Sequence, residues 1–149
     1  MKIALASDHG GVQLKESIKK FLSSRHVETE DLGTNGTDSV DYPDFAAEVA
    51  KKVSDGKVDA GVLICGTGIG MSMVANKFKG VRAAVVSDTY SAKMSKEHNN
   101  ANVLCLGGRV SNPAQAAELV QAWLEAKYEA GRHEKRLQKI RELEGKNFK

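Results

Sequence analysis

The sequence predicts a three-layer α/β protein, in which a five-stranded parallel sheet is covered by helices on both faces. Short apolar segments alternate with amphipathic segments along the whole of the 149-residue chain. The amphipathic connections are long enough to cross over between parallel strands, which a hairpin turn cannot do. Reactive side chains and glycines follow three of the apolar segments, and ligands of such sheets bind at that edge.

The first two strands flank an amphipathic helix. The apolar run Lys2–Ser7 is typical of a buried strand. The helix that follows it has a stripe of apolar residues, Leu14, Ile18, Phe21 and Leu22. The weak alternation of Val27–Leu32 indicates a second strand, and the polar segment Gly33–Asp38 indicates a loop.

The middle of the chain predicts a helix, a buried strand and a shorter helix. Pro43 suits the first turn of a helix. The apolar stripe of that helix consists of Phe45, Val49 and Val53. Residues Asp59–Ile64 are the third predicted strand, and the next helix is expected over about Gly68–Lys77.

The rest of the chain predicts two more strands and three helices. The β-branched run Val81–Ser87 indicates the fourth strand. Asp88 or Thr89 is expected to cap a helix that runs towards His98. The remaining elements are a fifth strand over Asn102–Leu106, a helix over Pro113–Tyr128 and a last helix from about His133 to Leu143.

Composition predicts a single cytoplasmic domain over residues 1–149. The hydrophobic share of 41% and the charged share of 28% are ordinary for a globular protein. The apolar start is cut short by Ser7-Asp8-His9, and no later run approaches the roughly 18 apolar residues of a membrane span. Cys65 and Cys105 lie far apart in the sequence and are expected to be free thiols.

The net charge of +3 comes from basic residues that are concentrated near the C-terminus. Glutamates such as Glu134 and Glu142 interrupt this basic segment, and no aromatic residues are interleaved with it. A small anionic ligand therefore fits better than a nucleic acid. Arg132 and Arg136 lie one helical turn apart, a spacing that suits either a phosphate clamp or a solvated helix face.

The most informative segment is Ile64-Cys65-Gly66-Thr67-Gly68-Ile69-Gly70. It places a thiol at the carboxyl end of a buried strand, beside a glycine loop and the start of a helix. Amide N–H groups at such a place favour negative charge, whether on a thiolate or on a bound oxyanion. This arrangement suggests catalysis, although a free cysteine can also be a small core residue and the glycines can serve a tight turn alone.

Other candidates follow the neighbouring strands. Asp8-His9-Gly10 comes after the first strand, and Gly107-Gly108-Arg109 comes after the fifth. His98 has the ordinary chemistry of a proton shuttle for sugar hydroxyls, although a polar turn at the surface would also explain it. Tyr42 lies at a helix entry from which it could reach the same edge.

The glycine loop differs from one nucleotide-binding motif and matches a second only in part. No Gly-Lys-Ser/Thr follows it, so it is not a Walker A loop. Met71 stands where the dinucleotide fingerprint requires glycine, although Asp88 lies near the spacing of the acid that binds the ribose. A dinucleotide-dependent oxidoreductase and a non-catalytic phosphate sensor therefore stay as alternatives.

Six motifs occur along nearly the whole chain in a specific order: Ser7-Asp8-His9-Gly10-Gly11, Val40-Asp41-Tyr42-Pro43, Ile64 to Gly70, Ala75-Asn76-Lys77, Glu97-His98-Asn99-Asn100-Ala101-Asn102 and Gly131-Arg132-His133. Together they resemble the type B ribose-5-phosphate isomerase family, which also contains allose-6-phosphate and galactose-6-phosphate isomerases. The resemblance implies a Rossmann-like sheet and an aldose–ketose isomerase of the pentose phosphate pathway. It also implies a reaction that needs no cofactor and no metal.

The resemblance assigns a role to each candidate residue. Cys65 would be the base that moves a proton between C2 and C1 of the sugar through a cis-enediol. His98, assisted by Thr67, would open the furanose ring. The loop residues Gly66, Gly68, Ile69 and Gly70 would present their amides to the enediolate. The other expected contacts are Asp8 to sugar hydroxyls, Tyr42 and Asn99 along the pocket, and His9, Arg109, Arg132 and Arg136 to the phosphate.

The resemblance also implies a homodimer, or a dimer of dimers, whose sites are built from both subunits. His98, Asn99 and Arg109 are expected to reach the site from the partner, and the C-terminal helix, about 132–145, is expected to pack on that partner. Cys65 indicates the cysteine-dependent branch rather than the branch that uses a glutamate near the position of Met71. Allose 6-phosphate and galactose 6-phosphate are the alternative substrates to ribose 5-phosphate.

Overall fold

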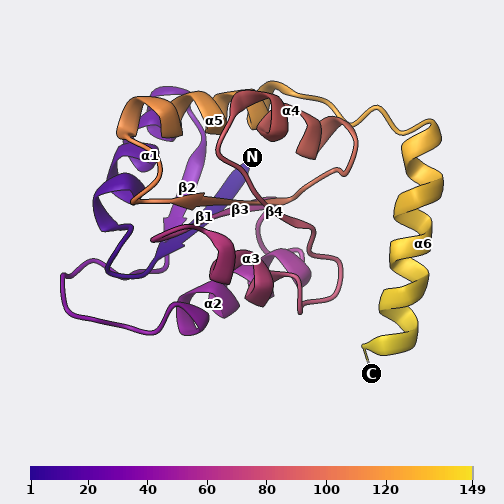
Figure 1. Cartoon of the computed structure of the whole chain (residues 1–149), viewed down its shortest axis with the longest axis horizontal. Coiled ribbons are helices and arrows are strands. Elements are labelled where there is room, and N and C mark those ends of the chain that lie inside the picture. Colours follow the sequence, from indigo (N-terminus) through magenta and orange to yellow (C-terminus); the bar gives the residue numbers. More distant parts are fainter. Residues whose placement is uncertain (149) are drawn as a thin grey trace.

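The computed structural model describes residues 1–148 and confirms the predicted three-layer α/β/α arrangement. Its sheet has five parallel strands in the order β2-β1-β3-β5-β4 (Figure 1). The strands are β1 (Lys2–Ser7), β2 (Glu28–Asp31), β3 (Ala60–Cys65), β4 (Ala83–Val85) and β5 (Val103–Gly107).

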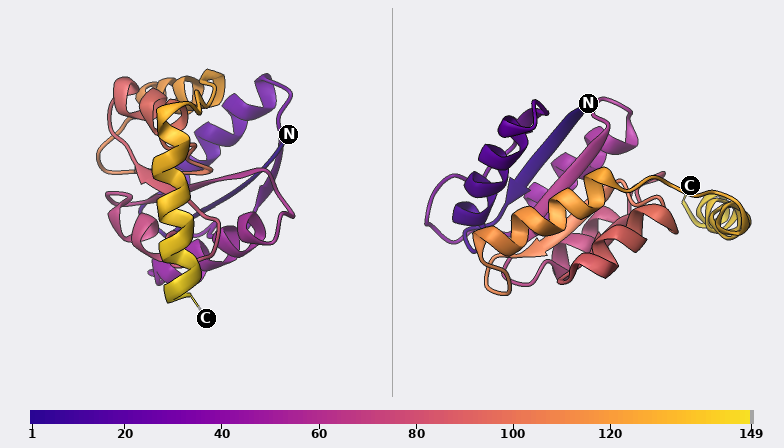
Figure 2. Two further views of the ribbon diagram at one scale, coloured as in Figure 1. Left: turned by 90° about the vertical axis from the view of Figure 1, so that its right-hand side faces the viewer. Right: turned by 90° about the horizontal axis from the view of Figure 1, so that it is seen from above.

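Five helices cover the two faces of the sheet, and a sixth lies beside it. One face carries α1 (Val12–Ser24), α4 (Thr89–Glu97) and α5 (Pro113–Glu125), and the other carries α2 (Tyr42–Ser54) and α3 (Ile69–Ala75) (Figure 1). The last helix, α6 (Arg132–Asn147), stands outside both layers, to one side of the sheet (Figure 2). Among residues 1–148, the helices include none that is long and apolar enough to cross a membrane.

The core forms two clusters because successive strand residues point to opposite faces. In β3, Val62 and Ile64 pack with α1 and α5, while Leu63 and Cys65 pack with α2 and α3. All six residues of β3 are buried, as expected for a central strand of a parallel sheet.

The fourth strand is shorter than predicted. Val81–Ser87 was expected to be extended, whereas β4 spans Ala83–Val85. The reason lies in its start: the backbone N–H of Val81 donates to the carbonyl of Phe78 in a turn, and that of Arg82 donates to the side chain of Asn102. At the edge of the sheet β4 pairs with β5 alone, so little else keeps it extended.

The last two helices also differ from the predicted ranges. Helix α5 ends at Glu125 rather than Tyr128 because Ala126 has an extended backbone with ψ of 148°. Helix α6 begins at Arg132 and continues to Asn147, beyond the expected end at Leu143.

The strand order creates a switch point between β1 and β3. The chain leaves β1 towards β2 on one side and returns to β3 on the other. Ligands of open α/β sheets bind at such a point, outside the carboxyl ends of the strands. Residues Asp8 and Gly66 directly follow these two strands, and the backbone N–H of Asp8 donates to the carbonyl of Ile64.

Candidate active site

The Cys65 side chain lies under the glycine loop. It is 6% exposed, and its Sγ accepts a hydrogen bond from the backbone N–H of Gly68 at 3.1 Å. Gly68 caps α3 with φ of +83°, in the left-handed region that favours glycine. A methyl group at Gly68 would also lie 2.9 Å from the backbone of Leu106. The loop therefore brings an amide donor directly to the sulfur, in surroundings that exclude most water.

Asp8 and His9 lie at the end of the neighbouring strand, and each has one hydrogen bond that fixes it. Asp8 is 8% exposed, and its Oδ1 accepts from the backbone N–H of Gly10 at 2.9 Å. Nδ1 of His9 accepts from the backbone N–H of Val40 at 3.2 Å. A ring nitrogen that accepts carries no proton, so the proton of the neutral ring is on Nε2, which can donate to an anion.

Arg109 joins this edge from the same chain, which corrects the expectation that it comes from a partner subunit. Its backbone N–H donates to the carbonyl of Gly66, and its guanidinium lies over Gly66 and Gly10. A methyl group added at Gly66 would be 3.1 Å from Nη1 of Arg109, and one at Gly10 would be 3.7 Å from Nη2. A cation thus stands next to the glycine loop within one subunit.

Tyr42 closes another side of this edge. Its ring packs on Gly70, where an added methyl group would lie 2.4 Å from the ring. Thr67 is exposed, and its Oγ1 accepts from the backbone N–H of Ile69. We call the residues gathered here the carboxyl-edge cluster: Asp8, His9, Tyr42, Cys65, Gly66, Thr67, Gly68, Ile69, Gly70 and Arg109.

The backbone beneath this cluster is packed so closely that one glycine cannot be replaced without a shift. A methyl group at Gly108 would lie 2.3 Å from the carbonyl oxygen of Gly10. We expect Gly108→Ala to lower the free energy of unfolding by about 1–3 kcal/mol, as overpacking does. Gly36→Ala is the matched control, since no atom lies within 4 Å of the added methyl group. Urea denaturation measures both, and equal midpoints for the two variants would contradict the close approach.

The other four predicted site residues lie at the opposite edge of the sheet. His98 and Asn99 follow the end of α4, while Arg132 and Arg136 lie on the first turns of α6. Cys65 is level with Gly107 in β5, four residues beyond Val103, which is about 13 Å at the rise of a strand. His98 follows the end of α4 and leads into the start of β5 at Val103, so it lies at the edge of the sheet opposite Cys65. We call His98, Asn99, Arg132 and Arg136 the amino-edge cluster.

His98 stacks on a second histidine that sequence reasoning did not select. The rings of His98 and His133 are 4.1 Å apart and nearly parallel. His133 is 6% exposed, with Nε2 at 3.8 Å from a carboxylate oxygen of Glu129. Burial lowers the pKa of His133, and the nearby His98 and Arg132 lower it further. The stack therefore favours neutral imidazole at His133 and ties α4 to α6.

The same three side chains have metal-ligating atoms within 4.8 Å of one another. The two imidazole planes differ by only 15°, so their in-plane lone pairs run side by side rather than towards one point. Nitrogen ligands of zinc lie about 2.0–2.1 Å from the ion and point at it. The stacked geometry therefore does not fit a metal centre, and none was expected from the sequence.

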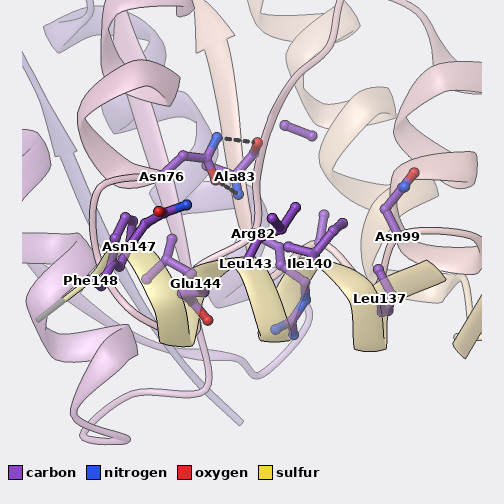
Figure 3. Close-up of a pocket in the computed structure, with 13 residues that line it drawn as sticks. Asn76, Arg82, Ala83, Asn99, Leu137, Ile140, Leu143, Glu144, Asn147 and Phe148 are labelled. Carbon is purple, nitrogen blue, oxygen red and sulfur yellow. Dashed lines mark hydrogen bonds between the residues drawn. The ribbon is translucent and has the colours of Figure 1, made fainter. Parts of the chain in front are cut away.

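A groove of about 450 Å³ separates α6 from the edge of the sheet (Figure 3). Its walls include Arg82, Asn99 and the apolar residues Leu137, Ile140 and Leu143. Leu137 is buried, but Ile140 and Leu143 are 49% and 57% exposed. Asn99 of the amino-edge cluster thus borders an apolar groove, whereas Cys65 lies at the other edge.

The fold and the carboxyl-edge cluster, with a nearly buried thiol, an amide donor and a cation at the switch point, suit an aldose–ketose isomerase that acts on a sugar phosphate. The sequence profile described as Ribose/Galactose Isomerase matches residues 3–140. The chain belongs to this family.

Similar proteins in this family are named as isomerases of sugar phosphates. Ribose-5-phosphate isomerase B of Escherichia coli is 49% identical over 96% of each chain. D-erythrulose-4-phosphate isomerase of Pectobacterium atrosepticum is 41% identical over 94% of this chain and 93% of that protein. A crystal structure of ribose-5-phosphate isomerase B from Mycoplasma genitalium with bound ribulose 5-phosphate is 44% identical. It has a TM-score of 0.95 and covers 98% of this chain and 97% of that one. The resemblance seen in the sequence is therefore confirmed.

Proposed function

We propose that this isomerase interconverts ribose 5-phosphate and ribulose 5-phosphate in the pentose phosphate pathway. One observation carries the proposal: the nearly buried Cys65 thiol lies beside a glycine loop and a cation, at the switch point of the sheet. The relative from Mycoplasma genitalium, which is described with ribulose 5-phosphate, supports the choice of this sugar.

Cys65 acts as the base in this reaction. As the thiolate, it removes the proton from C2 of the open-chain aldose, and the C–H electron pair forms the C1–C2 double bond of a cis-enediolate. Amides of the glycine loop donate to the oxygen that becomes negative. Transfer of the hydroxyl proton from O2 to O1 moves the negative charge to O2, and return of the C2 proton from Cys65 to C1 then gives the ketose and restores the thiolate. Each step moves protons within one sugar, so no electron acceptor is required.

The phosphate is held by groups with N–H donors. Nε2 of His9 and the guanidinium of Arg109 belong to the carboxyl-edge cluster, and Arg132 and Arg136 belong to the amino-edge cluster. Guanidinium groups suit phosphate because they offer paired donors. His98 opens the ring before C2 is exposed to the base.

The two clusters meet between two copies of the chain. They lie at opposite edges of one sheet, so His98 cannot reach Cys65 of its own subunit. In a symmetric dimer, each amino-edge cluster faces the carboxyl-edge cluster of its partner, and two equal sites result. The exposed apolar residues Ile140 and Leu143 on α6, and Ile69 and Met73 on α3, supply apolar surface for this contact.

A comparison of phosphorylated sugars tests the proposed function. We expect ribulose 5-phosphate to appear when the protein is incubated with ribose 5-phosphate, followed by NMR. We also expect kcat/KM to be lower for allose 6-phosphate, galactose 6-phosphate and D-erythrulose 4-phosphate. Faster turnover of one of these would reassign the substrate. Binding of ribose 5-phosphate without any turnover would favour a phosphate sensor instead. Binding of NAD would favour a dinucleotide-dependent oxidoreductase.

A further inference from the structure

A fully buried lysine lies beneath the loop that leads to the active site. Lys15 is in α1, between core residues such as Leu14 and Ile18, and its side chain is 0% exposed. Transfer of an ammonium group from water into a protein interior is costly unless each of its protons finds an acceptor. Lys15 is not part of either cluster, so its burial requires a separate explanation.

All three protons of Lys15 are donated to one short segment. Nζ lies 2.7 Å from Oδ1 of Asp31, 2.6 Å from the carbonyl oxygen of Thr34 and 2.8 Å from Oδ1 of Asn35. An ammonium group has three donors, so the set is complete. Burial acts to raise the pKa of Asp31, but the hydrogen bonds from Lys15 and Lys19 outweigh it and hold that pKa below its usual value.

The segment held by Lys15 runs along the end of β1. The backbone N–H of Ser7 donates to the carbonyl of Gly33, and that of Thr34 donates to the carbonyl of Ser7, each at 2.7 Å. Ser7 directly precedes Asp8 of the carboxyl-edge cluster. Lys15 therefore anchors the backbone next to the strand end that presents Asp8 and His9.

The chain beyond this anchor reaches the active site at two points. Residues 35–39 are exposed, and the loop next touches the body where the Val40 N–H donates to Nδ1 of His9. Tyr42 follows and packs on Gly70. The loop thus has a buried cation at one end and two site residues at the other, and its exposed middle has little else to hold it.

We propose that Lys15 is a positioning residue for the isomerase, which acts through the loop 34–42 to fix the tautomer of His9 and the place of Tyr42. This inference rests on the proposed function. Lys15 touches no substrate, and its loss acts on sugar-phosphate binding more than on proton transfer by Cys65. KM for ribose 5-phosphate then rises, while kcat changes little.

Four variants test the role of Lys15. Asn35→Ala removes one acceptor from an exposed residue, and we expect KM to rise about five-fold, the worth of one hydrogen bond. Asn35→Asp keeps an acceptor oxygen and should restore KM to near the parent value. Lys15→Met removes all three bonds and should raise KM about ten-fold or more. Lys19→Met is the control, because Lys19 also binds Asp31 but makes no hydrogen bond to the loop.

The state of His9 gives a readout that does not depend on turnover. Nitrogen NMR of the parent should find the His9 proton on Nε2, and Asn35→Ala should lose this fixed tautomer while Lys19→Met keeps it. A lower melting temperature with unchanged KM and an unchanged His9 tautomer would overturn the proposal. If Lys15→Met fails to fold, the comparison of Asn35→Ala with Asn35→Asp decides whether the proposal stands. If the parent does not isomerise ribose 5-phosphate, the proposed function fails. The His9 tautomer in the parent and in Asn35→Ala then still tests whether Lys15 positions the loop.

Discussion

Replacement of Cys65 by alanine is expected to lower kcat with ribose 5-phosphate by about 10²- to 10⁴-fold, the usual contribution of one acid–base group. No other thiol can take its place, because Cys105 is fully buried and burial raises the pKa of its thiol, which keeps it protonated. Binding of the sugar phosphate should persist in Cys65→Ala, since His9 and Arg109 are unchanged. Steady-state kinetics and calorimetric titration measure the two quantities.

Cys105→Ala is the matched control for this substitution. Like Cys65, Cys105 is a thiol on a central strand that points to the face of the sheet covered by α2 and α3. Unlike Cys65, it is not part of the carboxyl-edge cluster. We expect its kcat to stay near that of the parent. Turnover by Cys65→Ala at the parent rate would refute the assignment of the base, whatever the control does.

The second large effect is the recovery of activity in mixed dimers. Cys65→Ala and His98→Asn should each be inactive, because each removes one of the groups proposed to act on the sugar. When equal amounts of the two are refolded together, half of the dimers are mixed, and each mixed dimer has one intact site. We therefore expect about one quarter of the parent activity to return, as the symmetry of a dimer requires.

A second pair of variants makes this test specific. Cys65 and Arg109 both belong to the carboxyl-edge cluster of one chain. A mixture of Cys65→Ala and Arg109→Ala should therefore leave every site with a defect and should not regain activity. No recovery in the first mixture, although tagged subunits co-purify as mixed dimers, would contradict the shared site. Recovery in the second mixture would contradict the place of Arg109.

The central strands were predictable from sequence because buried strands of a parallel sheet are continuous apolar runs. The predicted strand Lys2–Ser7 has the same bounds as β1. The predicted strand Asp59–Ile64 differs from β3 by one residue at each end. The strand order was not predicted. A local sequence pattern cannot predict that β5 lies between β3 and β4, because this order depends on how the helices pack.

The carboxyl-edge cluster was also predictable, because its residues follow strand ends and such ends meet at one edge. The subunit that contributes Arg109 depends on distances across the fold, which sequence spacing does not contain. The sequence contains a signal from which the burial of Lys15 could have been predicted. At 100° per residue it lies about 20° from Leu22 around α1, within the apolar stripe. A charged residue in that stripe must find its partners inside the protein.

The position of α6 outside both helical layers has a consequence for how the enzyme tolerates change. In the proposed dimer, Arg132 and Arg136 of α6 bind a phosphate that is also held by the partner subunit, so separation of the subunits would take apart the site. Specific activity should then fall on dilution, once subunits separate. Substitutions at Ile140 or Leu143, which touch no reacting atom, would be recorded in an activity screen as inactivating.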